Sequence, residues 1–307
     1  MSEGRPAAPA PPVGDWQDDD DPEAALACYL ASVDQAGPAW PRPAGESARD
    51  FFATRFRPAP ARTALITGYC EPEYRGALRP DATHRHPLCA PPPGLAAGQR
   101  WHSRAEIRAR GLHAGLELVW LASALDAFLA QVQGSVRVRL PDGGVLRLGF
   151  AARNGRPYRS IGAELIRRGA VPAPRMSLAA IRDWCAAHPH EVEALLDHNP
   201  SYVFFRRLDL PATAGPVGAL GIPLTAGRSL AADPAHVPPG APVWVRDADG
   251  RRRLMIAQDR GSAIRGPARI DIFCGSGPAA EARAGAMRHL APVVPLLPLP
   301  GPAEAAR

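Results

Sequence analysis

Three aspartates in the last third of the chain have the side-chain chemistry to move a proton. Asp259 and Asp271 each end or interrupt a short apolar run beside glycines, and Asp233 stands upstream before Pro234. A carboxyl group in partly apolar surroundings has a raised pKa, so it can act first as a general acid and then as a general base. Each aspartate could equally do no more than accept hydrogen bonds from turn amides.

The elements that must position these aspartates are short strands. From Gly218 onward, brief apolar runs alternate with glycine and proline turns, a pattern that is typical of a small closed barrel. The runs that we interpret as strands are Leu220–Pro223, Ser229–Ala231, Pro242–Val245, Arg253–Gln258, Ala263–Ile264 and Arg269–Phe273.

The chain before Gly218 predicts a mixture of helices and strands. Residues 1–22 are rich in proline and alanine and end in an acidic run, so we expect them to be disordered. A hairpin is predicted from Ser135 to Tyr158, with its turn at Asp142-Gly143-Gly144. Residues 73–100, crowded with proline and histidine, are predicted to form a long loop. Further helices are expected near 22–33, 51–56, 103, 125–132, 160–168, 177–185 and 189–196, and strands near 61–69, 116–120 and 202–207.

Composition excludes several classes of protein. Apolar residues make up 46% of the 307 residues and charged residues 21%, which suits a soluble globular protein. The 36 basic residues are all arginines and lie scattered along the chain, so no nucleic-acid face is expected. A net charge of +6 could still attract an anionic polymer. The 36 prolines and 29 glycines favour short strands and loops over long helices.

No metal or cofactor site is expected. The five cysteines form no CxxC pair, and the two HxH pairs, at His84 and His188, lack partners at a helpful spacing. No phosphate-binding glycine loop is present, and Gly275-Ser276-Gly277 lacks the GxSxG spacing of a nucleophile elbow. We also find no transmembrane run and no signal peptide in the first residues, Met1 to Pro12.

The aspartates and several upstream segments together resemble one family. Asp233, Asp259 and Asp271 with their neighbours resemble the 3D domain, a double-psi β-barrel named for three aspartates. The order of the other segments, from about Thr63 to Leu290, resembles that of the membrane-bound lytic transglycosylase A (MltA-type) family. The segments that carry this resemblance are Thr67–Pro72, Ser103–Ile107, Gln131–Ser135, Asn154–Gly155, Tyr158–Gly162 and Asn199–Phe205.

The resemblance implies a mainly β fold with two domains and a few helices. A double-psi β-barrel would be built from both ends of the chain, with a second small β-barrel inserted between them. On this basis we expect the catalytic barrel to comprise residues 23–72 and 212–292 and the insertion to comprise residues 73–211. Residues 293–307 would form a proline-rich tail.

The resemblance also implies a peptidoglycan lytic transglycosylase that needs no cofactor. Such an enzyme uses the C6 hydroxyl of muramic acid as the nucleophile, so one carboxyl group can act as acid and then as base. Asp271 matches the family's catalytic aspartate, and Ile270, Ile272 and Phe273 are expected to supply its apolar surroundings. Asp259 is the rival catalytic candidate and is interpreted as an orienting partner, whereas Asp233 is interpreted as a turn residue.

Eight further residues in the matching segments are candidate sugar contacts. Tyr69 and Tyr158 could instead be core aromatics, Ser160 could only cap a helix, and the segment from Gln133 to Ser135 could be only a turn. The candidates are Thr67, Tyr69, Gln133, Gly134, Ser135, Tyr158, Arg159 and Ser160.

Two other functions remain open at this point. A double-psi barrel could grip peptidoglycan without cutting it, because a fold alone does not establish an activity. A hydrolase could use both Asp259 and Asp271. The resemblance implies glycan strands as the partner, with cell-wall synthesis or division proteins as further partners, and no nucleic acid. It also implies a location in the periplasm or at the outer membrane.

Overall fold

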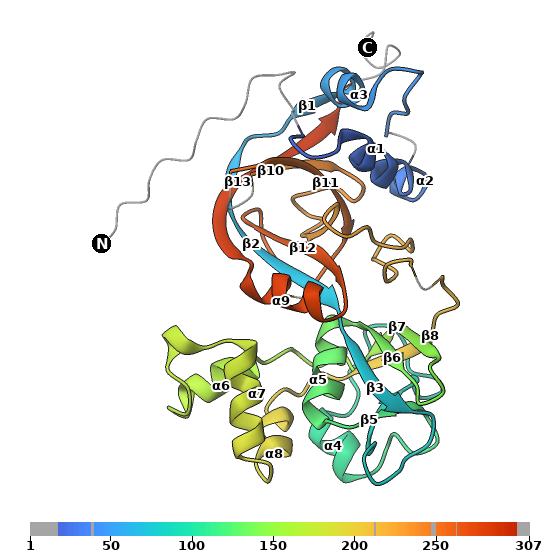
Figure 1. Ribbon diagram of the computed structural model, residues 1–307, viewed down its shortest axis with the longest axis vertical. Coiled ribbons are helices and arrows are strands. Elements are labelled where there is room, and N and C mark those ends of the chain that lie inside the picture. The colour runs from blue at the N-terminus through green and yellow to red at the C-terminus, as the bar shows by residue number, and fades with distance from the viewer. Residues whose placement is uncertain (1–17, 38–39, 212, 247–249, 262, 300–307) are drawn as a thin grey trace. The chain divides into compact units, whose positions relative to one another are not determined.

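The computed structural model describes residues 18–37, 40–211, 213–246, 250–261 and 263–299. The chain divides into two compact units (Figure 1). The first unit comprises the described residues within Met1–Cys70, Ala214–Gly275 and Ala279–Arg307, and the second comprises Glu71–Thr213 with Ser276–Pro278. A mainly β fold with a first unit built from both chain ends agrees with the fold class that the sequence predicts.

The first unit is a closed barrel. Its sheet has the order β1-β13-β10-β11-β9-β12-β2, and an additional pairing of β13 with β2 closes the ring. Alternate residues of each strand fill the interior, among them Leu230, Met255, Ile270 and Ile272. The strands are β1 (Phe56–Pro58), β2 (Arg62–Glu71), β9 (Ser229–Ala232), β10 (Pro242–Arg246), β11 (Arg252–Asp259), β12 (Arg269–Ser276) and β13 (Arg288–Pro298).

The predicted proline-rich tail from residue 293 is wrong for its first part, because β13 runs to Pro298. This strand changes partner along its length: it pairs with β2 up to Val293, with β10 from Val293 to Pro295 and with β1 from Leu296 to Pro298. Alternate apolar side chains of β13 are buried on both of its faces, and this burial outweighs the missing N–H groups of its prolines. Residues 300–307 lie outside the described residues.

The expected disorder of residues 1–22 is also wrong where the structure describes them. Asp18 is buried and forms an ion pair with the buried guanidinium of Arg228. α1 (Pro22–Leu30) then begins at the Asp21 cap, followed by α2 (Val33–Ala36) and α3 (Ala48–Arg55). These helices cover one outer side of the barrel with an aromatic cluster around Tyr29 and Phe56. The acidic run therefore has a buried cation to pair with, which its composition does not reveal.

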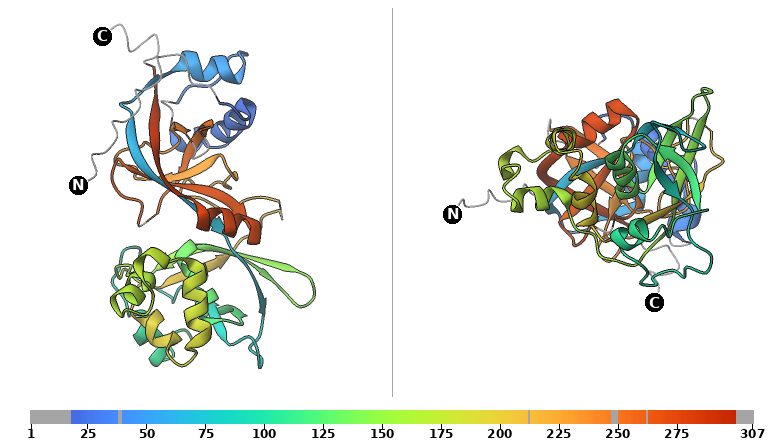
Figure 2. Two further views of the ribbon diagram at one scale, coloured as in Figure 1. Left: turned by 60° about the vertical axis from the view of Figure 1, so that its left-hand side comes forward. Right: turned by 90° about the horizontal axis from the view of Figure 1, so that it is seen from below.

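The second unit contains a six-stranded sheet of order β4-β5-β3-β6-β7-β8. Its two end strands, β4 and β8, lie in contact, so the sheet curls towards closure. The predicted hairpin is confirmed as β6 and β7, and Figure 2 shows it extending away from the helices of this unit. The strands are β3 (Glu73–Ala77), β4 (His86–Cys89), β5 (Glu117–Leu121), β6 (Ser135–Arg139), β7 (Val145–Arg153) and β8 (Val203–Arg207).

The predicted loop at residues 73–100 is wrong, because β3 and β4 lie within it. Both strands pair with β5, and β3 also pairs in parallel with β6. The prolines and histidines hide an ordinary strand pattern, since Leu88 and Cys89 are fully buried against β5. Tertiary pairing here overrides the local signal for a loop.

Five α-helices of the second unit follow the sequence pattern closely. Serine side chains cap the first turns of α4, α5, α6 and α7, as Ser103 does with Glu106 in a capping box. α5 packs Ala127 and Ala130 on the sheet and packs Leu125 and Phe128 on the later helices. The helices are α4 (Arg104–Ala109), α5 (Ala124–Gln133), α6 (Ile161–Arg167), α7 (Leu178–Ala187) and α8 (Val192–Asp197).

Two predicted strands of the first unit are absent, and its helices α2 and α9 were not predicted. Leu220–Pro223 forms only an isolated bridge to Val217, and Ala263–Ile264 lies in a turn. α9 (Pro278–Ala286) packs Ala280 and Ala284 against Cys274 and Cys70. None of the helices in the described part of the chain is long and apolar enough to cross a membrane.

The carboxylate of Glu71, at the end of β2, pairs with arginines of β6 and β7. It is fully buried and accepts hydrogen bonds from Arg137 Nε (2.7 Å), Arg147 Nη2 (3.1 Å) and Ser276 Oγ (2.8 Å). Two residues further on, Glu73 of β3 pairs with Arg139 of β6, but that arginine is half exposed. Glu71 therefore forms buried glutamate–arginine ion pairs, and Glu73 forms an exposed one that can serve as a control.

We expect Glu71→Gln to lower the free energy of unfolding by about 3 kcal/mol, since it leaves buried arginines without a counter-charge. The exposed control Glu73→Gln is expected to cost less than about 1 kcal/mol. Urea denaturation of both variants measures the difference. Equal losses in the two variants would contradict a central role for the Glu71 carboxylate.

Candidate active site

Asp259 and Asp271 pair with the same residue, Ala231 of the central strand β9. β11 pairs in parallel on one side of β9 and β12 pairs antiparallel on the other, so Asp259 and Asp271 flank Ala231. Their α-carbons are thus two strand spacings apart, roughly 9.5 Å. Leu230, Ile270 and Ile272 point into the barrel, so Ala231 and Asp271 lie on the outer face of the wall.

A bulge in β11 brings Asp259 to that face. The pairing register shifts between Ala257 and Asp259, which leaves Gln258 as the extra residue. Gln258 is buried, donates to the Cys28 carbonyl (2.6 Å) and accepts from Ser229 Oγ (2.6 Å). Without the bulge, simple alternation would turn Asp259 to the interior side. This role of Gln258 was not predicted, because nothing in the local sequence pattern marks a bulge.

Asp271 has one hydrogen-bond partner among the described residues. Thr67 Oγ1 donates to its Oδ1 at 2.6 Å, and its Oδ2 has no protein partner in the described part of the chain. Partial burial raises the pKa of the Asp271 carboxyl above its ordinary value, while the Thr67 hydroxyl and the positive charge of Arg269 hold that pKa down. The negative charge of Asp259 adds to the rise. Asp271 is therefore a carboxyl group with a free oxygen and a proton that it retains more readily than usual.

The apolar surroundings expected for Asp271 are only partly correct. Ile270 and Ile272 belong to the barrel interior, on the opposite side of β12. Phe273, two residues on, lies on the same face as Asp271, and its ring lies 5.4 Å from the ring of Tyr69. Side chains of successive residues in a strand point to opposite faces. The prediction that Ile270 and Ile272 surround Asp271 was wrong because it relied on adjacency in the sequence.

Asp259 is held by three donors. Tyr69 donates its hydroxyl to Oδ2 (2.8 Å), and the amides of Ala219 (3.0 Å) and Arg260 (2.9 Å) donate to Oδ1. Burial raises the pKa of the Asp259 carboxyl, and these three hydrogen bonds oppose that rise. Burial, with the adjacent Asp259 charge, keeps the pKa of Tyr69 well above its usual value, so its phenol remains a donor. Both Asp259 oxygens are thus already engaged.

Strand β2 supplies a hydrogen-bond donor to each of the two aspartates, because its side chains alternate between the two faces. Thr67 and Tyr69 are two residues apart and therefore share the outer face with the aspartates. Gly68 between them faces the opposite way, where a Cβ would lie 2.8 Å from Cys274 Sγ and 2.8 Å from the Ala284 Cα. Glycine at this position lets β2 approach β12 and α9 closely enough for Thr67 to reach Asp271.

A cavity of about 140 Å³ lies beside Asp259 within the first unit. Its walls include Ala219, Pro234, Pro239, Asp259 and Arg260. The Ala219 amide and Arg269 are site residues that the sequence analysis missed. The loop amide gives no sequence signal, whereas Arg269 could have been found from its position two residues before Asp271 on one strand.

Asp233 takes the structural role that its sequence context predicts. Its carboxylate accepts from the amides of Ala235 (3.1 Å) and Gly266 (2.8 Å). These backbone donors lower the pKa of the Asp233 carboxyl, the opposite direction from the other two aspartates. Asp233 thus ties two loops together, and these amides favour its charged form.

The remaining predicted contact residues lie in the second unit. Ser160 caps α6 by accepting from the Ala163 amide (3.2 Å), and Gly134 ends α5 with a left-handed φ of 78°. Gln133 is half-buried, Ser135 is buried at the start of β6, and Tyr158 and Arg159 are exposed. The structure therefore brings together Asp271, Asp259, Thr67 and Tyr69, and it groups the other six residues in the second unit.

No group of three or more histidine, cysteine, aspartate or glutamate side chains in the described ranges is arranged to hold a metal ion. All five cysteines are buried, and none forms a disulfide bond.

Comparison with known protein families gives two matches. Residues 65–206 match the MltA specific insert domain, and residues 228–297 match the 3D domain. The Membrane-bound lytic murein transglycosylase A of Escherichia coli K12 is 39% identical over 249 residues, which cover 77% of this chain and 66% of that protein. The matched region therefore spans just under two thirds of this curated relative.

Solved structures show the same likeness. The membrane-bound lytic murein transglycosylase from Agrobacterium tumefaciens is 33% identical with a TM-score of 0.75, covering 90% of this chain and 84% of that one. E. coli MltA with bound chitohexaose is 34% identical with a TM-score of 0.70, covering 78% and 72% of the two chains.

The opposite pKa shifts of Asp271 and Asp233 predict opposite effects of amidation on stability. A raised carboxyl pKa contributes stability at low pH that is lost as the pH rises through it, so Asp271→Asn should raise Tm at pH 7 by about 2 °C. The difference should vanish below the unfolded pKa of aspartate, about 3.9.

Asp233→Asn is the matched control for this measurement. A lowered pKa contributes stability that is present at neutral pH and lost as the pH falls through it, so this variant should melt below the wild type at pH 7. Scanning fluorimetry at pH 7 and pH 3.5 measures both differences. A lower Tm for Asp271→Asn at pH 7 would mean that its charge is not penalised by burial.

Proposed function

The chain belongs to the membrane-bound lytic murein transglycosylase A family, and from that premise we propose that it cleaves the glycan strand of peptidoglycan without water. The bond cut is the MurNAc-β-1,4-GlcNAc linkage, and the product ends in a 1,6-anhydro-MurNAc. The observation that carries this proposal is Asp271, a partly buried carboxyl group with a raised pKa whose Oδ2 accepts no hydrogen bond from the described residues.

The proposed reaction uses the Asp271 carboxyl twice. Its proton goes to the glycosidic oxygen as the bond from C1 of MurNAc to that oxygen breaks. The resulting carboxylate then takes the proton of the C6 hydroxyl as O6 bonds to C1. The net result is a cleaved strand and a carboxyl group that is protonated again, so no second catalytic carboxylate is needed.

The engagement of Asp259 favours this lyase over a two-carboxylate hydrolase. A hydrolytic base must hold and deprotonate a water, or attack the sugar itself. Both oxygens of Asp259 already accept hydrogen bonds from Tyr69 and two amides. We therefore assign Asp259 the role of an orienting anion that fixes Tyr69 and raises the Asp271 pKa through its charge.

We further propose that the predicted contact residues bind the sugars. Thr67 and Tyr69 lie beside the aspartates. Tyr158 and Arg159 expose an aromatic ring and a cation, and Gln133, Gly134, Ser135 and Ser160 contribute amide and hydroxyl groups. The bound chitohexaose in the E. coli relative supports a glycan strand as the ligand.

The location proposed for this chain is the cell envelope, in the periplasm or at the outer membrane. This rests on the names of its relatives, which are membrane-bound murein enzymes. Contact with cell-wall synthesis or division proteins is proposed on the family resemblance alone.

The test of the proposal is digestion of purified sacculi followed by mass spectrometry of the products. The wild type should release anhydro-muropeptides. Asp271→Asn should lose at least about 10³-fold in rate, and Asp259→Asn should lose about 10–100-fold and still give anhydro products. Products heavier by one water would identify a hydrolase, and binding of sacculi with no release by the wild type would identify a glycan-binding module.

The pH dependence of cleavage tests the acid role of Asp271 separately. Since the reacting carboxyl must be protonated, activity should fall as the pH rises through its pKa. Arg269 holds that pKa down, so Arg269→Gln should move the alkaline limb of kcat/KM to higher pH. The exposed Arg265 lowers the pKa of Asp233 through its charge. As the control variant, Arg265→Gln should therefore leave the alkaline limb of kcat/KM unchanged. A limb that moves to lower pH in Arg269→Gln would exclude Asp271 as the acid.

A further inference from the structure

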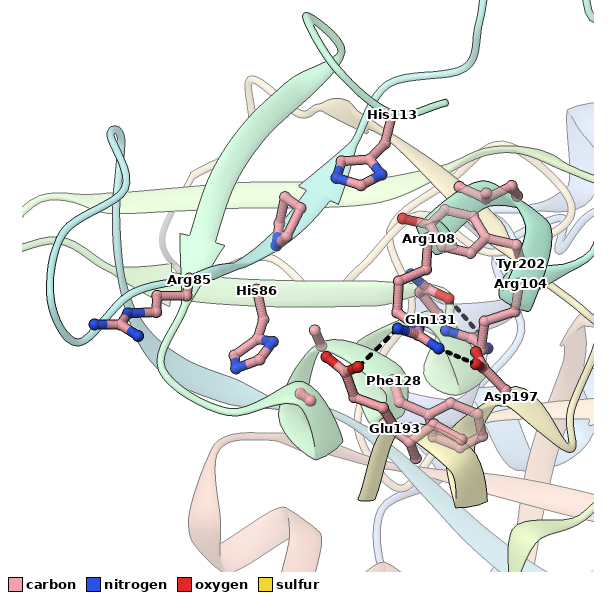
Figure 3. A pocket seen from close by; sticks show the side chains of 15 residues that line it. Arg85, His86, Arg104, Arg108, His113, Phe128, Gln131, Glu193, Asp197 and Tyr202 are labelled. Atoms are coloured by element: carbon pink, nitrogen blue, oxygen red, sulfur yellow. Dashed lines mark hydrogen bonds and ion pairs between the residues drawn. The ribbon is translucent and has the colours of Figure 1, made fainter. Parts of the chain in front are cut away.

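The second unit contains a cavity of about 180 Å³ that none of the proposed chemistry uses. It is lined by β4, one face each of α4 and α5, the end of α8 and Tyr202, and all its lining residues belong to the second unit (Figure 3). We call it the Arg104 pocket, after the cation in its wall. The charged residues of its lining are Arg85, Arg104, Arg108, Glu193 and Asp197.

Arg104 is a buried cation that forms no ion pair with a carboxylate in the described part of the chain. Only 8% of the residue is exposed. Its Nε donates to the Asn199 carbonyl (3.2 Å), and its Nη2 donates to Gln131 Oε1 (2.6 Å) and to the Ser201 carbonyl (2.8 Å). These acceptors are neutral, and Nη1 has no hydrogen-bond partner among the described residues. The guanidinium also lies over the rings of Phe128 (4.7 Å) and Tyr202 (5.2 Å).

Such a burial is costly unless an anion compensates it. Desolvation lowers the pKa of Arg104 to about 10, which leaves it charged at neutral pH. Its neighbour Arg108, by contrast, is paired with Glu193 (2.7 Å) and Asp197 (2.5 Å), as the dashed lines in Figure 3 show. Arg85, at the exposed edge of the pocket, has no ion-pair partner in the described residues. The lining therefore carries three arginines and two carboxylates, which leaves one net positive charge, and the charge of Asp197 acts on Arg104 as well as on Arg108.

We propose that the Arg104 pocket binds the free carboxylate end of a short peptide. A carboxylate matches the planar guanidinium and carries a single charge. A phosphate would bring a second charge towards Glu193 and Asp197. The apolar walls, Ala124, Phe128 and Leu196, suit a small side chain, and the half-exposed Glu193 can accept a hydrogen bond from a peptide N–H.

The volume limits the size of the ligand. A bound water needs about 10–15 Å³ of such space, so the pocket has room for on the order of a dozen waters, or one to two amino-acid residues. This inference rests on the proposed function for its source: peptidoglycan strands carry short peptides that end in carboxylates. The pocket then directs the enzyme to strands that carry such peptides.

Binding is tested with the full chain and N-acetyl-D-Ala-D-Ala as the probe, monitored by NMR titration. The free acid should bind at least about tenfold more tightly than its C-terminal amide, because the amide removes the charge-assisted pair with Arg104. Equal affinity for acid and amide, or tighter binding of inorganic phosphate than of the peptide, would overturn the proposal.

A blocking variant locates the binding without touching the buried arginine. Ala124→Leu fills the cavity from the first turn of α5. This variant should bind the free-acid probe at least about tenfold more weakly than the wild type does. Ala122→Leu, an exposed neighbour outside the cavity, should bind as the wild type does. Unchanged binding by Ala124→Leu would exclude this pocket. Arg104→Lys keeps the charge but loses the planar fork, and its binding should also fall, with folding checked by its melting curve.

Cleavage assays distinguish the source of the peptide and separate this inference from the proposed function. A higher KM of Ala124→Leu for peptide-bearing strands, with an unchanged KM for peptide-free strands, identifies a strand-borne peptide. If Ala124→Leu binds the probe more weakly but keeps the wild-type KM for both peptide-bearing and peptide-free strands, the ligand is a free peptide. A wild-type protein that binds the probe but cleaves neither kind of strand would refute the proposed lytic activity. The assignment of the Arg104 pocket would still hold.

Discussion

The pairing of one alanine with two aspartates is the constraint on which the proposed chemistry depends. Ala231 lies on the central strand β9, and β11 and β12 bring Asp259 and Asp271 to its two sides. The bulge at Gln258 is what turns Asp259 to the same face, and the hydrogen bonds of Gln258 to α1 and β9 stabilise that bulge. A helix near the chain start thus secures the geometry of a site near the chain end.

The same barrel wall gives its two carboxyl groups different tasks. Burial raises the pKa of both, but Asp259 is surrounded by three donors and Asp271 by one. An anchored carboxylate is suited to hold Tyr69 and to exert a field, whereas a carboxyl with a free oxygen is suited to exchange a proton with a substrate. Strand β2 supplies the distinguishing partners, Thr67 and Tyr69, from one face.

Two buried charged residues of the second unit differ in the kind of partner that they have. Glu71 is enclosed by two arginines and a serine, so its charge is used within the fold. Arg104 is enclosed by carbonyl and amide oxygens and two rings, so its charge remains available. Burying a charge without a close ion-pair partner is costly, and an anion bound in the adjacent cavity would reduce that cost for Arg104.

The sequence alone determined the family, the mainly β class, the β6–β7 hairpin and the serine-capped helices, because these depend on local periodicity, capping residues and the order of motifs. It also singled out Asp271, Asp259, Thr67 and Tyr69. Only the tertiary structure decided that Ile270 and Ile272 face away from Asp271, that residues 73–89 and 293–298 contain strands, and that Asp18 pairs with Arg228. The physical reason is that strand pairing and burial join residues far apart in the chain. A bulge, a loop amide such as that of Ala219 or an unpaired buried arginine therefore leaves no local signal.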